Sequence, residues 1–217
     1  MTVSGDAGDV VLVHGMGLPA MSLGFLAVDL RRAGYPVHFV HYRTRAAGVE
    51  GLVRRFLLPV FERCRHDRPI HVVAHSLGAI LVRWYLQDAA LPTGSRVVLL
   101  APPNQGSEVV DRLRDWPPFR WFAGAVGQQL GTGPDGIVRR LQPVSAEVGV
   151  IAANRSLQPW FSRMLTGEND GVVTVRGTRL PEMRDFVVVE SAHNLMLFNG
   201  TVRNQVLRFL ATGRFCH

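Results

Sequence analysis

One serine motif in the chain has the setting that nucleophilic catalysis requires. Ala-His-Ser-Leu-Gly at residues 74–78 follows an apolar run at residues 70–73 and precedes a helical pattern. A sharp turn between a strand and a helix can lift a serine hydroxyl above a sheet, provided that the residues two before and two after the serine are small. Ala74 and Gly78 meet this requirement. We therefore expect Ser76 to be a nucleophile, and helix capping is the alternative role for its hydroxyl.

A serine hydroxyl needs a base within hydrogen-bond reach, and the base needs a carboxylate that holds it in place. In a strand–turn–helix site the acid and then the histidine follow the serine along the chain. Asp170 lies in a polar turn after the fifth expected strand, and His193 follows the sixth. We expect these two residues to be the acid and the base. Glu168 is an alternative acid, and Asp170 could instead act only as the turn former of an Asp-Gly pair.

Other serines and histidines compete for these roles. Ala-Met-Ser-Leu-Gly at residues 20–24 matches the serine motif equally well, so the motif alone is not decisive. Ser22 follows a loop rather than a strand, and we interpret it as an ordinary residue in the first turn of a helix. Among the eight histidines, His41 lies at a strand end but precedes the serine motif. His193 alone combines the expected order with a motif context.

Two backbone amides are expected to form an oxyanion hole. In acyl transfer these N–H groups come from the residue after the nucleophile and from the loop after the first strand, which here are Leu77 and Met16. Gly15 and Gly17 flank Met16 and let the backbone turn inward without a clashing Cβ. The same loop lacks the Gly-Lys-Ser/Thr ending of a phosphate-binding loop and the third glycine of a dinucleotide-binding loop.

Strand-like runs alternate with helical patterns, which predicts an α/β fold with a mostly parallel sheet of about six strands and helices on both faces. The expected strands cover residues 10–13, 36–42, 70–74, 97–101, 148–152 and 186–189. The expected helices cover residues 19–33, 49–65 with a kink at Pro59, 77–88 and 195–210. Because ligands bind beyond the carboxyl ends of parallel strands, the motifs above should meet at one edge.

The regular order lapses between the fourth and fifth expected strands. We predict one domain over residues 1–217, with a lid-like insertion at residues 106–146 that is rich in proline, glycine and aromatic residues. Packing of these aromatics onto the sheet is one interpretation, and a wall for an apolar substrate is the other. On the second interpretation, the expected substrate-binding residues are Leu18, Trp116, Phe119, Trp121, Phe122 and Met196.

Taken together, these motifs resemble the lipase and esterase branch of the α/β-hydrolase superfamily, in particular its small bacterial members. The resemblance rests on Val-His-Gly at residues 13–15, the serine motif, Asn-Asp-Gly at residues 169–171, the late His193, and Ala-Pro-Pro-Asn-Gln-Gly-Ser at residues 101–107. The chain departs from the family's usual pattern in the number of strands, since the family's sheet usually has eight and this sequence predicts about six.

The resemblance implies hydrolysis of a carboxylic ester through an acyl-enzyme intermediate, without a metal or an organic cofactor. It does not fix the acyl chain, the alcohol or the oligomeric state. Thioester hydrolysis or acyl transfer with the same residues is an alternative, because one scaffold serves several chemistries. A non-catalytic ligand-binding protein on the same fold is a rival of another class.

Composition limits the partners. All 24 basic residues are arginine and they are scattered, so the net charge of +7 does not predict a nucleic-acid surface, although transient contact with an anionic lipid interface stays open. The expected partner is a small-molecule or lipid ester. Cys64 and Cys216 are expected to be reduced thiols. Residues 1–6 carry no basic or apolar leader and no run reaches the ~20 apolar residues of a membrane span, so we expect a cytoplasmic protein.

Overall fold

The computed structural model describes residues 8–217 and contains one sheet of six parallel strands in the order β2-β1-β3-β4-β5-β6. The expected parallel sheet is therefore confirmed. Residues 1–6, on which the expectation about a leader rests, lie outside the described residues. The strands are β1 (Asp9–Val13), β2 (Val37–Val40), β3 (Ile70–His75), β4 (Arg96–Leu100), β5 (Glu147–Ala153) and β6 (Asp185–Val189).

The centre of the sheet is β3, which pairs with β1 on one side and with β4 on the other. Ala74, two residues before Ser76, lies opposite Val13 in β1 and Leu99 in β4. Because every strand is parallel to its neighbours, all six carboxyl ends lie at the same edge. The segments after β1, β3, β5 and β6, which carry the expected site residues, all leave the sheet there.

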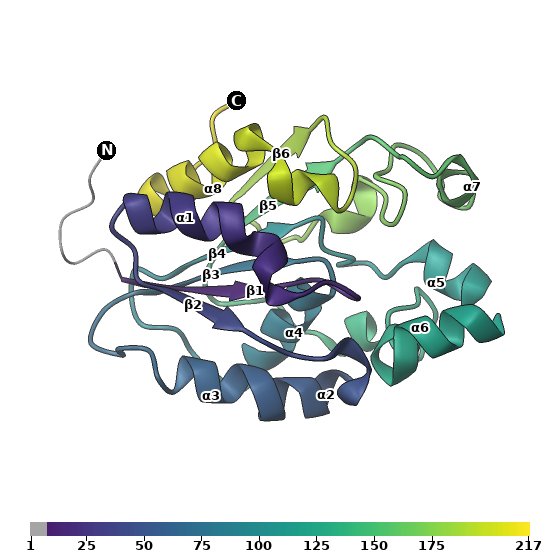
Figure 1. Cartoon of the computed structure of the whole chain (residues 1–217), viewed down its shortest axis with the longest axis horizontal. Helices are drawn as coiled ribbons and strands as arrows, with labels where there is room; N and C mark the ends of the chain where they lie inside the picture. Colours follow the sequence, from purple (N-terminus) through teal and green to yellow (C-terminus); the bar gives the residue numbers. More distant parts are fainter. Residues whose placement is uncertain (1–7) are drawn as a thin grey trace.

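Helices cover both faces of the sheet. On one face lie α1 (Gly24–Arg32) and α8 (Gly200–Thr212), and on the other lie α2 (Val49–Leu52), α3 (Leu58–Phe61) and α4 (Leu77–Tyr85) (Figure 1). Alternate side chains of a strand point to opposite faces, so Val10 and Leu12 pack with α1 and α8, whereas Val11 and Val13 pack with α2 to α4. This double burial explains why residues 10–13 of β1 are all apolar.

Three further helices lie beyond the carboxyl ends of the strands: α5 (Glu108–Leu113), α6 (Pro117–Gln128) and α7 (Pro159–Ser162) (Figure 1). The sequence did not predict α5 and α6, because proline and glycine in residues 102–146 suggested irregular structure. Pro117 instead occupies the first turn of α6, where a missing N–H costs no hydrogen bond. Gly124 interrupts α6 with φ 62° and ψ −164°. These residues mark where a helix begins and bends.

Three other predicted helices differ in detail. The helix expected at residues 49–65 ends at Phe61 and contains a π turn at Val53–Leu57 between α2 and α3. Pro59 lacks an N–H and crowds the carbonyl one turn back, and a wider turn just before it relieves both effects. The first helix begins with a 3₁₀ turn at Ala20–Leu23, and another 3₁₀ turn at Leu195–Phe198 precedes α8.

Two remaining expectations concern thiols and membranes. Cys64 is buried, Cys216 is exposed, and neither forms a disulfide. Across residues 8–217, the structure contains no helix with the length and apolar character that a membrane crossing requires.

Candidate active site

Ser76 lies in the tight turn between β3 and α4. Its φ of 52° and ψ of −121° place it in a region that side-chain-bearing residues rarely adopt. The turn is held by a hydrogen bond of 2.9 Å from the Ser76 N–H to the carbonyl of Leu100 in β4. A Cβ on Gly78 would lie 2.5 Å from the His14 carbonyl oxygen, so only glycine lets α4 approach β1 this closely. The small residue expected at position 78 is therefore a packing requirement.

The serine, the histidine and the aspartate expected from the sequence meet at the carboxyl edge of the sheet. The Ser76 Oγ and the His193 Nε2 are 2.9 Å apart. The His193 Nδ1 is 2.7 Å from the Asp170 Oδ2. All three residues are buried, with 8%, 6% and 1% of Ser76, His193 and Asp170 exposed. With the Nδ1 proton donated to the carboxylate, the Nε2 lone pair faces the serine hydroxyl.

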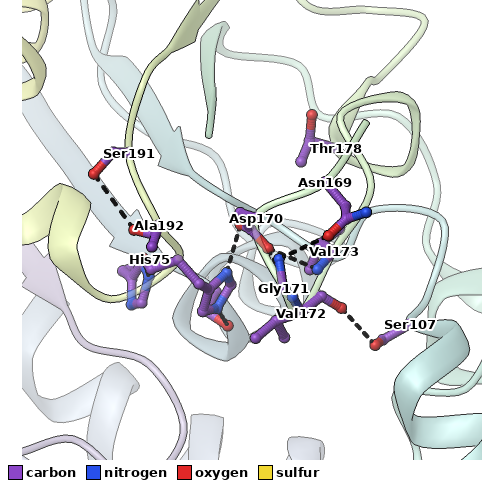
Figure 2. A network of polar contacts seen from close by, with 12 residues as sticks. His75, Ser107, Asn169, Asp170, Gly171, Val172, Val173, Thr178, Ser191 and Ala192 are labelled. Atoms are coloured by element: carbon purple, nitrogen blue, oxygen red, sulfur yellow. Dashed lines mark hydrogen bonds and ion pairs between the residues drawn. The ribbon is translucent and has the colours of Figure 1, made fainter. Parts of the chain in front are cut away.

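Asp170 is held by the turn in which it lies (Figure 2). Its Oδ1 accepts hydrogen bonds from the N–H groups of Val172 and Val173 at 2.9 and 2.8 Å, which leaves Oδ2 for His193. Gly171 permits the turn with φ 93°. The Ser107 hydroxyl, at the start of α5, donates to the Val172 carbonyl at 2.9 Å. The carboxylate is therefore oriented by its own turn and tied to the segment that follows β4.

The competing residues lie elsewhere. Glu168 is exposed, and its carboxylate accepts a hydrogen bond of 2.7 Å from the Asn154 side chain. The carboxylate that contacts His193 is that of Asp170. Ser22 belongs to the 3₁₀ turn before α1, as its loop context predicted. His41 is exposed, with its ring 6.0 Å from that of Phe39.

Neither of the two backbone amides expected for the oxyanion hole donates to a protein group within residues 8–217. Leu77 is the first residue of α4, where an N–H has no acceptor inside the helix. Within the part of the chain that the structure describes, no protein group accepts a hydrogen bond from the Met16 N–H. The next amide, Gly17 N–H, donates to the Thr44 hydroxyl at 3.1 Å, and Gly17 has φ 69°. Thr44 therefore fixes the turn that presents Met16.

A cavity of about 570 Å³ opens directly on Ser76 and His193. Most of its remaining lining comes from α5, from α6, and from the segments around α7 and after β6. Three of the six expected substrate-binding residues line it, Trp116, Phe119 and Phe122, and so does Met16, which was expected at the oxyanion hole. A volume of this size with an apolar lining is typical of sites for small organic ligands.

The other expected substrate-binding residues do not line this cavity, which corrects their placement. Trp121 is 68% exposed. The guanidinium carbon of Arg45 lies over the Trp121 ring, 4.4 Å from the ring centroid. Met196 is fully buried in the core between the sheet, α1 and α8. Leu18 is half-buried and packs against the same core. Nearness in sequence to a site residue did not predict the direction of these three side chains.

Sequence reasoning missed several lining residues. Val109, Val110 and Leu113 come from α5, and Leu157 and Phe161 come from the segment around α7. Their position in the chain could have predicted that they line the cavity, since both segments follow strands whose carboxyl ends lie at the site. Their amino-acid pattern alone does not distinguish them from ordinary surface turns.

One cluster of potential metal ligands lies at the opposite end of the sheet. Asp9, His38 and Cys64 place one ligand atom each within 4.8 Å of one another. The Asp9 carboxylate, however, already accepts a hydrogen bond of 2.7 Å from Arg68. Burial raises the pKa of the Cys64 thiol to about 11, so the thiol stays protonated. These groups are explained by an ion pair that anchors the start of β1.

A parallel sheet between two helical layers, with a strained serine at the turn after its central strand, defines a hydrolase of the α/β type. The sequence matches the alpha/beta hydrolase family model over residues 10–204. The chain therefore belongs to the alpha/beta hydrolase family. No curated protein matches the sequence.

Solved structures with lipase or esterase names share this fold. A Bacillus licheniformis lipase in its mature form has a TM-score of 0.77 at 17% identity, over 97% of this chain and 94% of that chain. A metagenomic carboxyl esterase has a TM-score of 0.69 at 19% identity, over 89% and 66%. A Legionella pneumophila phospholipase has a TM-score of 0.63 at 18% identity, over 79% and 45%. At these identities the likeness shows the fold alone.

Asp170 and Glu168 have different hydrogen-bond partners, so substitutions at these two positions can be compared directly. Asp170→Asn removes the carboxylate that fixes the His193 tautomer, and we expect the turnover rate to fall by up to about 10⁴-fold. Glu168→Gln keeps its bond to Asn154, and we expect activity within a few-fold of wild type. Steady-state kinetics on both variants checks this, with circular dichroism to show that each is folded. The reverse ranking would move the acid to Glu168.

Proposed function

We propose that the protein is a serine hydrolase that cleaves carboxylic esters through an acyl-enzyme intermediate. The observation that carries this proposal is the hydrogen-bonded chain from the Ser76 Oγ through the His193 imidazole to the Asp170 carboxylate, with distances of 2.9 and 2.7 Å. Such a chain lets a histidine remove the serine proton as the hydroxyl attacks a carbonyl carbon. The lipase, esterase and phospholipase names of the structural neighbours agree with ester substrates.

In the proposed reaction, the Ser76 Oγ bonds to the carbonyl carbon while its proton moves to the His193 Nε2. The carbonyl oxygen becomes negatively charged and accepts hydrogen bonds from the Met16 and Leu77 N–H groups. Collapse of this intermediate breaks the ester C–O bond, and His193 gives its proton to the departing alcohol. A water molecule, deprotonated by His193, then attacks the acyl-enzyme by the same route and releases the acid and free Ser76.

Two alternatives use the same fold. Thioester hydrolysis or acyl transfer needs the same three residues and differs only in the leaving group or in the acceptor. A non-catalytic ligand-binding role would leave the hydrogen-bonded chain without a use. Aryl esters from acetate to palmitate, tested beside one thioester, separate the ester and thioester assignments, and an added alcohol acceptor tests for acyl transfer.

Labelling of the nucleophile tests the proposal. We expect a fluorophosphonate probe to modify Ser76 and no other serine, because Ser76 is the one serine within residues 8–217 whose hydroxyl contacts a histidine, at 2.9 Å. Ser76→Ala should lower ester turnover by about 10⁴-fold or more while the protein stays folded. Peptide mapping by mass spectrometry locates the adduct. An adduct on Ser22, or an unlabelled but folded wild-type protein, contradicts the assignment.

The cavity favours an apolar acyl group. Phe119 and Phe122 of α6 line it, and Leu113 of α5 does too. Phe122 also lies against the loop that presents Met16, since a Cβ on Gly17 would be only 2.7 Å from its ring. An acyl chain that leaves the carbonyl near Ser76 would therefore contact Phe122.

This position makes the effect of Phe122 depend on acyl chain length. Each CH₂ group that loses its contact forfeits about 0.8 kcal/mol, so two or three of them correspond to about ten-fold or more in rate. We expect Phe122→Ala to lower kcat/KM for an octanoate ester by this additional factor relative to acetate. Trp121→Ala is the matched control, because Trp121 adjoins Phe122 but lies outside the cavity. Equal losses on acetate and octanoate for Phe122→Ala would remove α6 from the acyl site.

The mouth of the cavity carries exposed apolar side chains, which we call the apolar rim. Four rim residues also line the cavity: Trp116, Phe122, Leu157 and Leu195. We include in the rim three further exposed residues that lie close in sequence to cavity-lining ones, Trp121, Trp160 and Phe198, and the whole rim is 48–68% exposed. Gathered apolar exposure of this kind marks an interaction surface.

The charges beside the rim favour an anionic lipid surface as the place where the protein meets an ester. Arg120 is exposed and precedes Trp121 in the sequence, Arg163 is exposed and follows Trp160 by three residues, and Arg45 stacks on Trp121. The chain as a whole carries a net charge of +7. Tryptophan side chains favour the boundary between water and lipid, and arginine side chains are attracted to anionic headgroups.

Vesicle binding can be measured without catalysis. We expect the Ser76→Ala variant to sediment with vesicles that contain phosphatidylglycerol, and added Trp121→Ala and Trp160→Ala substitutions to weaken this binding by about ten-fold or more. Leu58→Ala on α3, an exposed apolar residue outside the rim, serves as the matched control. Absence of sedimentation, or equal weakening by the control, contradicts a lipid-docking rim.

A further inference from the structure

His75 contacts three separate parts of the site, although the proposed reaction does not use it. It is the last residue of β3 and immediately precedes Ser76. Its Nε2 is 3.1 Å from the carbonyl oxygen of His193. Its ring also lies against the loop that presents Met16, because a Cβ on Gly15 would be 2.6 Å from the His75 Nδ1. Figure 2 shows His75 beside the segment at Ala192.

The hydrogen bond defines the protonation state of His75. A carbonyl oxygen only accepts, so the Nε2 of His75 must carry a proton and donate it. The Nδ1 is buried and has no hydrogen-bond partner, so it gains nothing from a proton of its own. Burial, followed by the nearby His193, holds the pKa of His75 well below its usual value. The ring is therefore neutral and has a single tautomer.

Four groups of His193 make polar contacts, and its main-chain carbonyl is one of them. The side chain is held by Asp170 at Nδ1 and faces Ser76 at Nε2. The main-chain N–H donates to the Asp170 carbonyl at 3.3 Å, and the main-chain carbonyl accepts from His75. Asp170 thus holds His193 from one side, and His75 holds its main chain from the strand that carries the nucleophile.

Packing alone does not explain a histidine at this position. His75 is 0% exposed, and an apolar side chain of similar size would fill the space without leaving a buried nitrogen unpaired. Buried polar atoms without partners are uncommon in folded proteins and call for a specific explanation. The neutral state also matters, because a second positive charge 4.9 Å from the His193 ring would oppose its protonation during acyl transfer.

We propose that His75 is a positioning residue for the base: its Nε2–H holds the main chain of His193 and thereby sets the approach of the His193 Nε2 to the Ser76 Oγ. This inference rests on the proposed role of Ser76 and His193. It does not depend on the identity of the ester, since proton removal from the serine is common to every acyl substrate.

Two substitutions of similar shape isolate the hydrogen bond. His75→Gln keeps an N–H donor at a reach comparable to Nε2, whereas His75→Met has a similar length and no donor. We expect His75→Met to slow fluorophosphonate labelling of Ser76 and kcat for an aryl ester by about 10- to 100-fold, with KM little changed, because misplacement of a base acts on the chemical step. His75→Gln should recover the rate to within about five-fold of wild type.

His71→Met is the control for packing, since His71 is buried in the same strand at its other end. It should lower thermal stability and leave the labelling rate unchanged. Equal labelling rates for folded His75→Gln and His75→Met overturn the proposal. A wild-type protein that reacts with fluorophosphonate but cleaves no ester would refute the proposed function, while the comparison at His75 would still stand on the labelling rates.

A measurement on the wild-type protein covers the case in which the variants do not fold. In an assigned ¹⁵N-histidine NMR spectrum at neutral pH, His75 should show the neutral tautomer with the proton on Nε2. A neutral ring with its only proton on Nδ1 cannot donate from Nε2 to the His193 carbonyl and overturns the proposal.

Discussion

The backbone at Ser76 is the constraint on which the rest of the site depends. A φ of 52° in a side-chain-bearing residue is unfavourable, and it persists because the neighbouring elements leave no room for a relaxed turn. Helix α4 packs closely against the carbonyl oxygens at the end of β1, because Gly78 has no Cβ at the point of contact. That contact holds the start of α4, with the Leu77 amide, against the end of β1, from which the Met16 loop leaves. The strained serine and the packing of α4 on β1 are thus parts of one arrangement, and the proposed oxyanion amides belong to the same two segments.

Much of this arrangement could be predicted because it is encoded locally. The apolar run before Ser76, the small residues on either side of it and the helical pattern after it are adjacent in sequence. Asp170 and His193 are distant, but a parallel sheet brings all of its carboxyl ends to one edge, so the order of strands was enough to predict that they meet. The Asp-Gly pair that raised a second role for Asp170 does form a turn, and that turn orients the carboxylate toward His193, so turn formation is compatible with the proposed acid role.

What could not be predicted depends on side-chain direction and on irregular helices. Trp121 and Phe122 are neighbours, yet one stacks on Arg45 at the surface and the other lines the cavity. Gly124 bends α6 just after them, and no periodic pattern reports such a bend. Met196 follows His193 closely, but the 3₁₀ turn that contains it rotates its side chain into the core. The π turn before Pro59 likewise replaces a kink with a local widening.

The spacing of the catalytic candidates along the chain ties activity to the order of synthesis. Ser76 and His193 are 117 residues apart, and His193 follows β6, the last strand of the sheet and one of its edges. A nascent chain that has emerged as far as β4 holds the proposed nucleophile and both proposed oxyanion amides, but it has neither Asp170 nor His193, the proposed acid and base. Without a base the hydroxyl is a poor nucleophile, so such a chain is chemically silent. On the proposed mechanism, Ser76 therefore becomes reactive only when β6 and the segment after it have joined the fold.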